Sequence, residues 1–129
     1  MYKNYKLGSY YCRKTYKLGW VGIYVQDNLS CTPIGLTKFC NELDLEVCGL
    51  KINISKKVFC ITCIYRPPTG NFGTFIYLLQ WALDKVYTNS INLIICGDVN
   101  INYLKDSNYK TKLNSAGNIQ LTQCSWFSH

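Results

Sequence analysis

Histidine is nearly absent from this chain of 129 residues, whose single histidine is the last residue, His129. Metal sites built from imidazole groups are therefore not expected. Eight cysteines are present, but the one CxxC pair, Cys60 and Cys63, falls in a strand-like run. Residues three apart on a strand face opposite sides of a sheet, which is poor geometry for binding one metal ion. The cysteines are expected to be small buried apolar residues rather than zinc ligands.

Long apolar runs are also lacking. The longest, 58–65, is far too short to cross a bilayer. The first residues contain no apolar stretch typical of a secretory signal. We therefore expect no disulfide framework, and we expect the cysteines to be reduced thiols. These absences predict an intracellular protein, nuclear or cytoplasmic, with no membrane segment.

Acidic residues are scarce, with 7 Asp and Glu against 14 Lys and Arg and a net charge of +7. This balance favours a polyanionic partner, although the same charge also serves solubility. The first 17 residues have five basic residues, five tyrosines and no acid. Such a mixture can bind phosphates and stack on bases. The alternative is a twisted strand with tyrosines on one face and lysines on the other.

The length suits one domain with a real hydrophobic core. Strands are predicted at 20–25, at 46–54 with one solvent-exposed face, and at 58–65. Ser55-Lys56-Lys57 separates the last two, so they are predicted to form a hairpin. The tyrosine-rich beginning and these runs give the N-terminal half a strong β character.

A helix and a further strand follow the proline-rich break at 67–71. Apolar residues recur at offsets of three and four over 72–87, which predicts an amphipathic helix entered near Asn71. The run 91–96, apolar except for Asn92, predicts a strand buried on both faces that ends at Gly97 and Asp98. Strand, helix and strand in this order indicate an α/β core.

Two segments carry candidate chemistry, Tyr65-Arg66-Pro67-Pro68 and Gly97-Asp98-Val99-Asn100. Asp98 and Asn100 point the same way if strand geometry continues between them. A carboxylate beside a carboxamide can hold a water molecule near a phosphate, with the aspartate as base. Taken alone, Gly-Asp-x-Asn is also the sequence of an ordinary turn.

The two segments together, separated by an amphipathic helix, resemble the endonuclease/exonuclease/phosphatase superfamily, which includes apurinic endonucleases and the endonucleases of LINE-type (non-LTR) retrotransposons. Tyr5-Lys6-Leu7 followed by Arg13, and then residues 19–25, Gly-Trp-Val-Gly-Ile-Tyr-Val, are similar to the retrotransposon enzymes, whose corresponding segment is Gly-Gly-Val-Gly-Ile-Tyr-Val. Trp20 replaces the second glycine. Glu46 with Val47 resembles the acidic residue that opens the family's next strand. The resemblance covers about residues 2–114 in order.

What the resemblance implies is a magnesium-dependent phosphodiesterase that nicks DNA, associated with a reverse transcriptase. Tyr65 matches the tyrosine that hydrogen-bonds the scissile phosphate, and Asp98 matches the aspartate that orients or deprotonates the attacking water. Asn100 matches the asparagine that positions this aspartate, and Arg66 is a candidate phosphate contact. The implied fold is a partial four-layer α/β sandwich, with two mixed sheets and outer helices. The implied cofactor is Mg²⁺, the partner is DNA, and no small-molecule cofactor is expected.

The sequence also departs from the family. The glutamate that is the family's main metal ligand and its late Asp-His pair are not found, and the role of that histidine is not transferred to His129. Residues 115–129 form a divergent tail. We therefore expect a single, incomplete domain over residues 1–129 that is inactive by itself. The alternatives are a non-catalytic basic nucleic-acid-binding module and an unfolded gene-model remnant.

Overall fold

Strands form most of the fold. The computed structural model describes residues 3–16, 19–87, 92–101 and 111. Its elements, in chain order, are β1 (Tyr5–Cys12), β2 (Trp20–Gln26), β3 (Cys31–Ile34), the short 3-10 helix η1 (Thr37–Phe39), β4 (Glu46–Ile54), β5 (Lys57–Tyr65), α1 (Phe72–Val86) and β6 (Asn92–Asp98).

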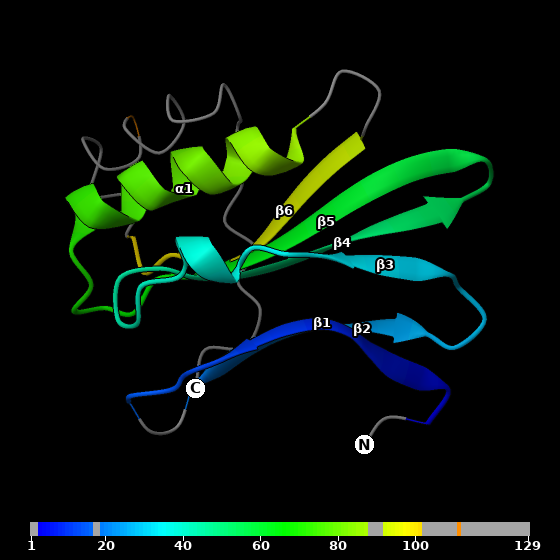
Figure 1. Cartoon of the computed structure of the whole chain (residues 1–129), viewed down its shortest axis with the longest axis horizontal. Coiled ribbons are helices and arrows are strands. Elements are labelled where there is room, and N and C mark those ends of the chain that lie inside the picture. The colour runs from blue at the N-terminus through cyan, green and yellow to red at the C-terminus, as the bar shows by residue number, and fades with distance from the viewer. Residues whose placement is uncertain (1–2, 17–18, 88–91, 102–110, 112–129) are drawn as a thin grey trace.

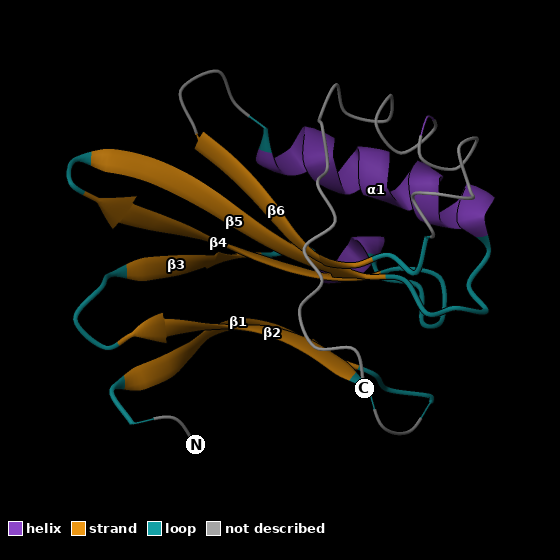
Figure 2. Ribbon diagram, turned by 180° about the vertical axis from the view of Figure 1, so that it is seen from behind, coloured by secondary structure: helices purple, strands orange, loops and turns teal. Residues whose placement is uncertain are grey.

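The strands make two sheets. β1 and β2 pair antiparallel in a two-stranded sheet, and the larger sheet has the order β3-β4-β5-β6. The larger sheet is mixed, because β5 and β6 run parallel while its other pairs are antiparallel. Figure 1 shows three layers, with α1 over one face of the larger sheet and the β1–β2 pair under the other. The view from behind in Figure 2 shows the same stacking.

Most of the predicted elements are confirmed. The strands expected at 20–25, 46–54 and 58–65 are β2, β4 and β5, and the helix expected at 72–87 is α1. The predicted hairpin is also present, since Ile54 pairs with Lys57. Its two central residues, Ser55 and Lys56, have φ values of 51° and 66°. Two positive φ values match the turn whose twist suits a two-residue hairpin.

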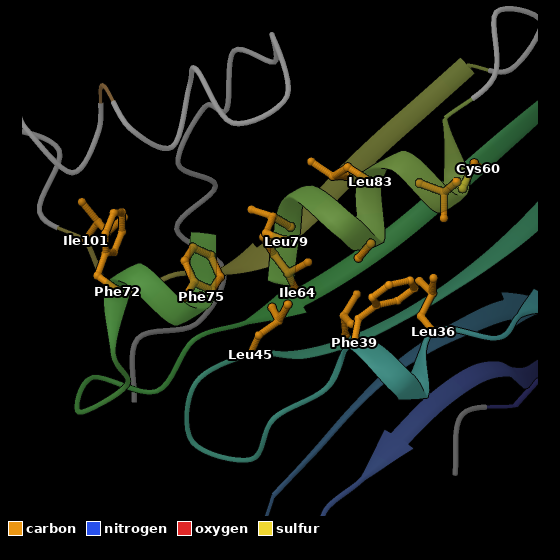
Figure 3. Close-up of a cluster of buried hydrophobic side chains, with 13 residues drawn as sticks. Leu36, Phe39, Leu45, Cys60, Ile64, Phe72, Phe75, Leu79, Leu83 and Ile101 are labelled. Atoms are coloured by element: carbon orange, nitrogen blue, oxygen red, sulfur yellow. The ribbon is translucent and has the colours of Figure 1, made fainter. Parts of the chain in front are cut away.

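The main core lies between α1 and the larger sheet (Figure 3). α1 begins after Asn71, whose side chain accepts a hydrogen bond from the backbone N–H of Thr74 and so caps the helix. The helix buries one face against the sheet, where Phe75, Leu79 and Ala82 are almost fully buried. Their neighbours in this core come from η1, β4 and β5: Leu36, Phe39, Val47, Cys60 and Ile64.

A second apolar layer joins the two sheets. Tyr11 and Val21 pack with Cys48, and Val25 packs with Leu50 and Ile52. β4 is therefore covered on both faces, and residues 46–50 are all buried. The prediction of one solvent-exposed face for this strand is wrong over that stretch, because the β1–β2 pair covers the face of Cys48 and Leu50 and the helix-side core covers the face of Val47.

The expected four-layer α/β sandwich with outer helices is wrong. The described part of the chain is mostly β and contains one α-helix, which covers one face of the larger sheet. On the outer face of the β1–β2 pair, Tyr10 and Trp20 are 61% and 54% exposed. The elements of the described residues therefore form three layers, helix on sheet on sheet.

The strand expected at 91–96 is β6, but it is not buried on both faces. It is an edge strand, and Ile94 is 45% exposed. Leu93 and Ile95 pack against the helix-side core. Within the described residues, no helix is both long and apolar enough to cross a membrane.

Candidate functional site

One end of the larger sheet brings together side chains from three neighbouring strands. Tyr65 pairs with Asp98 in the parallel β5–β6 ladder, and Glu46 pairs with Tyr65 in the antiparallel β4–β5 ladder. Directly paired residues point to the same face of a sheet. We call Glu46, Tyr65 and Asp98 the edge row. Its face is the one covered by β1 and β2, because Cys48, two residues from Glu46, packs against Tyr11 and Val21.

Asp98 is the last residue of β6, and the turn that follows it depends on glycine. Gly97 has φ +136°, and a Cβ placed there would lie 1.8 Å from the carbonyl oxygen of Ile64 on the neighbouring strand. Only glycine allows this approach of two backbones. Asp98 is exposed, and its Oδ1 accepts a hydrogen bond from the backbone N–H of Asn100 at 2.9 Å.

Asn100 does not continue the strand. Its φ of 52° is left-handed, so the expectation that the Asp98 and Asn100 side chains point the same way is not met. The Asn100 side-chain amide instead donates to the carbonyl oxygen of Arg66 at 2.5 Å, and the Arg66 N–H donates to the carbonyl oxygen of Asp98 at 2.9 Å. Asn100 is linked to Asp98 through its main chain, and its side chain ties together the ends of β5 and β6.

Arg66 is buried below the turn between β5 and α1. Its terminal nitrogens donate to the carbonyl oxygens of Val99, Asn100 and Gly70 at 3.0 to 3.2 Å. The guanidinium also lies 5.3 Å from the centre of the Phe72 ring. These are the contacts of a side chain that holds two loops together. The phosphate contact expected for Arg66 stays a prediction, and it gains no support from this position.

A second arginine, Arg13, lies at the edge row; the sequence included it in the family resemblance but gave it no role. Arg13 Nε is 2.9 and 3.0 Å from the two carboxylate oxygens of Glu46, and one terminal nitrogen is 2.7 Å from Oε2. The Glu46 side chain is 1% exposed and that of Arg13 is 11% exposed. The hydrogen bond with Glu46 is the main cause that raises the pKa of Arg13 above its ordinary value, and the negative charge of Glu46 contributes. The hint in the sequence was Glu46, which already resembled a family residue.

The loop that follows Arg13 is held by a second carboxylate. Glu42 accepts hydrogen bonds from the backbone N–H groups of Lys14, Thr15 and Tyr16. Desolvation raises the pKa of Glu42, but these hydrogen bonds outweigh it and lower the pKa below its ordinary value. Glu42 and Glu46 thus join the β1–β2 pair to the larger sheet at the end where the edge row lies.

No family model and no curated protein matches this chain. The superfamily resemblance therefore stays a prediction that depends on the motifs and on the geometry of the edge row. His129 and the divergent tail at 115–129 lie outside the described residues.

The described residues do not by themselves form a magnesium site. They contain no group of three or more His, Cys, Asp or Glu side chains that could hold a metal ion. Both oxygens of Glu46 contact Arg13, and one oxygen of Asp98 accepts the Asn100 N–H. Magnesium prefers near-octahedral oxygen ligands and is commonly held by one or two carboxylates together with water molecules and substrate phosphates.

Cysteines form a second row beside the edge row. Cys48 pairs with Cys63, and Cys63 pairs with Cys96, so the three lie side by side on one face. Cys60 belongs to the helix-side core whereas Cys63 packs toward the small sheet, which confirms that this CxxC pair faces opposite sides. The Cys96 thiol donates a hydrogen bond to the carbonyl oxygen of Thr62 at 3.7 Å. The neighbouring Cys63 thiol lowers the pKa of Cys96 below its ordinary value, and Cys96 raises the pKa of Cys63.

Proposed function

We propose that this chain carries part of the site of a magnesium-dependent DNA phosphodiesterase of LINE-type retrotransposon origin, and that it does not hydrolyse DNA by itself. The observation that supports this proposal is the register of β5 and β6, which pairs Tyr65 with Asp98 at one end of the larger sheet. In open sheets, the carboxyl ends of parallel strands are where ligands bind. The two motif segments, 33 residues apart, thus meet in space.

The proposed chemistry assigns one role to each residue. The Tyr65 hydroxyl donates a hydrogen bond to a non-bridging phosphate oxygen. Asp98 accepts a proton from the water whose oxygen attacks phosphorus, while the Asn100 N–H holds the carboxylate in place. The bond from phosphorus to the leaving sugar oxygen then breaks. None of the described residues is assigned to protonate that oxygen, and Mg²⁺ is retained only as a requirement that the resemblance implies.

A nicking assay tests the proposal. Residues 3–101 would replace the corresponding segment of an active LINE-type endonuclease, and nicking of supercoiled plasmid would be measured with Mg²⁺ and with a chelator. We expect Asp98→Asn to slow Mg²⁺-dependent nicking by about 100-fold or more, because a general base contributes that much. Asn53→Ala, at an exposed position near the β4–β5 turn, is the matched control. Equal rates for the Asp98 variant and its parent would refute the proposed role.

A second candidate function, a non-catalytic nucleic-acid binder, is favoured by the outer face of the β1–β2 pair. Tyr10 and Trp20 project from it, and the Trp20 ring lies edge-on to Tyr24 with centroids 6.2 Å apart. Exposed Lys3, Lys6 and Lys14 lie in the same segment. The tyrosines are not confined to one face as the alternative reading of this strand expected, since Tyr11 is buried and Tyr10 is exposed.

Fluorescent single-stranded DNA distinguishes this candidate. Stacking on an aromatic residue contributes about 1–3 kcal/mol per base, so Trp20→Ala should weaken binding by about tenfold or more. Binding should also weaken as salt rises. Tyr77→Ala, which removes an equally exposed aromatic ring from α1, is the control. Salt-insensitive binding, or equal losses in both variants, would exclude this face as a nucleic-acid platform.

A further inference from the structure

Arg13 presents a partly unused guanidinium group beside the edge row. Its contacts with Glu46 run along one edge of the guanidinium, from Nε to one terminal nitrogen. No described residue accepts a hydrogen bond from the other terminal nitrogen. The two terminal nitrogens of Arg13, which together form a fork, therefore have N–H donors that no described residue uses. A guanidinium has five N–H donors, and this geometry matches two oxygens of a phosphate.

The fold holds this guanidinium in one place. Gly19, across the β1–β2 loop, leaves the space that the group occupies, because a Cβ at that position would lie 2.3 Å from Arg13 Nε. The backbone N–H of Arg13 donates to the Gly19 carbonyl oxygen at 3.1 Å. Glu42 fixes the next three residues through their N–H groups. A side chain fixed in this way loses little conformational freedom when it binds a ligand.

A buried ion pair of this kind is weak evidence for stability alone. Removing a carboxylate and a guanidinium from water costs several kcal/mol per ion, and an apolar pair of similar volume is often as stable. The position of the pair points elsewhere: Glu46 is the register partner of Tyr65, which is the partner of Asp98. The other arginine of the chain, Arg66, is occupied by backbone carbonyl oxygens.

We propose that Arg13, oriented by Glu46, is the phosphate-binding residue of the edge row and contacts a phosphate of a bound DNA strand through its two terminal nitrogens. This inference rests on the proposed function, because it assigns the phosphate held by Arg13 to the strand that reaches Tyr65 and Asp98. Glu46 offsets part of the charge of Arg13 but fixes the direction of its fork. Recognition is therefore expected to depend on geometry more than on net charge.

The chain contains only two arginines, Arg13 and Arg66, so their side-chain N–H signals can be followed separately by ¹⁵N NMR. A short DNA duplex would be titrated into the whole chain at low salt. We expect the guanidinium signals of Arg13 to shift in a saturable manner and those of buried Arg66 to stay in place. Saturable shifts elsewhere in the protein with none at Arg13 would overturn the proposal.

Substitutions distinguish the contribution of the paired N–H donors of Arg13 from the contribution of its positive charge. Arg13→Lys keeps the positive charge but loses the paired donors, and should weaken duplex binding by about tenfold. Lys14→Gln removes a neighbouring charge and should weaken it by less. If Arg13→Lys unfolds the chain, the double variant Arg13→Gln with Glu46→Gln takes its place, because it leaves no buried charge unpaired. This folded double variant must show the same loss of duplex binding. If Arg13→Lys and Lys14→Gln weaken duplex binding equally, Arg13 contributes only positive charge and the proposal fails.

The nicking chimera distinguishes failure of this inference from failure of the proposed function. If Asp98→Asn abolishes nicking while Arg13→Lys leaves both KM and kcat unchanged, Arg13 has no part in binding and the proposed function stands. If Arg13 responds to DNA but Asp98→Asn nicks like its parent, the proposed hydrolytic role fails. Raised KM with Arg13→Lys, together with lost turnover with Asp98→Asn, is the result expected when both hold.

Discussion

Single residues at the ends of β5 and β6 decide whether the candidate site can form. Gly97 is the clearest case, because the carbonyl group of Ile64 occupies the space that any side chain would need. Neither partner is a flexible side chain that could move aside. The approach of these two backbones brings Asp98 level with Tyr65.

Gly97→Ala should therefore lower the free energy of unfolding by more than about 2 kcal/mol. Urea denaturation of the whole chain measures this change. Gly35→Ala is the matched control, because a Cβ there meets nothing within 4 Å, and it should change stability by less than about 0.5 kcal/mol. Similar values for the two variants would show that β5 and β6 do not approach as described.

Cys96 is expected to be the most reactive of the buried or half-buried cysteines near the edge row. The neighbouring Cys63 thiol favours the Cys96 thiolate and lowers the pKa of Cys96, whereas burial raises the pKa of Cys48 to about 12. Alkylation of Cys96 should rise through a midpoint below the ordinary thiol value of about 8.5, because a thiol with a lowered pKa forms the reactive thiolate at lower pH.

Mass-spectrometric mapping of alkylated peptides across pH measures this midpoint. Cys63→Ala removes the neighbouring thiol that lowers the pKa of Cys96, and should move the midpoint of Cys96 upward. An unchanged midpoint in the variant would rule out Cys63 as the cause. Cys48 should stay unmodified over the same range and serves as the internal reference.

At the scale of elements, the hairpin between β4 and β5 sets the register of the edge row. Its turn residues, Ser55 and Lys56, adopt positive φ values without being glycine or asparagine. Such residues strain the backbone. Ser55→Asn with Lys56→Gly should therefore raise the free energy of unfolding by about 0.5–1 kcal/mol.

Thermal and urea denaturation of the double variant measure this gain. Lys56→Ala alone keeps a Cβ at a positive φ and should bring none. A destabilised double variant would mean that the turn has another conformation, and the pairing of Glu46 with Tyr65 would then be in doubt.

Local patterns predicted most elements because their signals are short-range. The helical spacing of Phe72 to Val86 and the turn at Ser55 are visible within a few residues. β3 was missed, since four residues that include Pro33 show no alternation and owe their strand to pairing with β4. The burial of β6 was overestimated, because an apolar run does not reveal that its strand lies at a sheet edge.

The meeting of Tyr65 and Asp98 was predictable, because a strand, a helix and a parallel strand place their ends at one edge. Asn100 was misplaced, since its left-handed φ ends the strand at Asp98. The Arg13–Glu46 pair joins residues 33 apart in sequence and exists only because two separate sheets pack together. No local pattern reports such a contact, and for the same reason Arg66 was preferred over Arg13.

At the scale of the whole molecule, the β1–β2 pair is bound to the rest by an apolar layer and by two carboxylates at one end. Glu46 is buried with Arg13, whereas Glu42 lies at the surface and holds the β1–β2 loop through three N–H groups. Protonation of Glu42 would weaken these hydrogen bonds. Lowering the pH is therefore expected to weaken the attachment of the β1–β2 loop to the larger sheet.

The direction in which stability changes with pH follows from the lowered pKa of Glu42. A carboxyl whose pKa is lower in the folded state contributes stability above its ordinary pKa of about 4.3, and this contribution is lost as the pH falls through the lowered value. In an NMR titration, the backbone amide signals of Lys14, Thr15 and Tyr16 should move together with a shared midpoint below about 4.3. Glu42→Gln should abolish this shared titration while the signals of α1 remain unchanged. A midpoint at or above the ordinary value would mean that the carboxylate does not hold the loop, and the fixed position proposed for Arg13 would lose one of its supports.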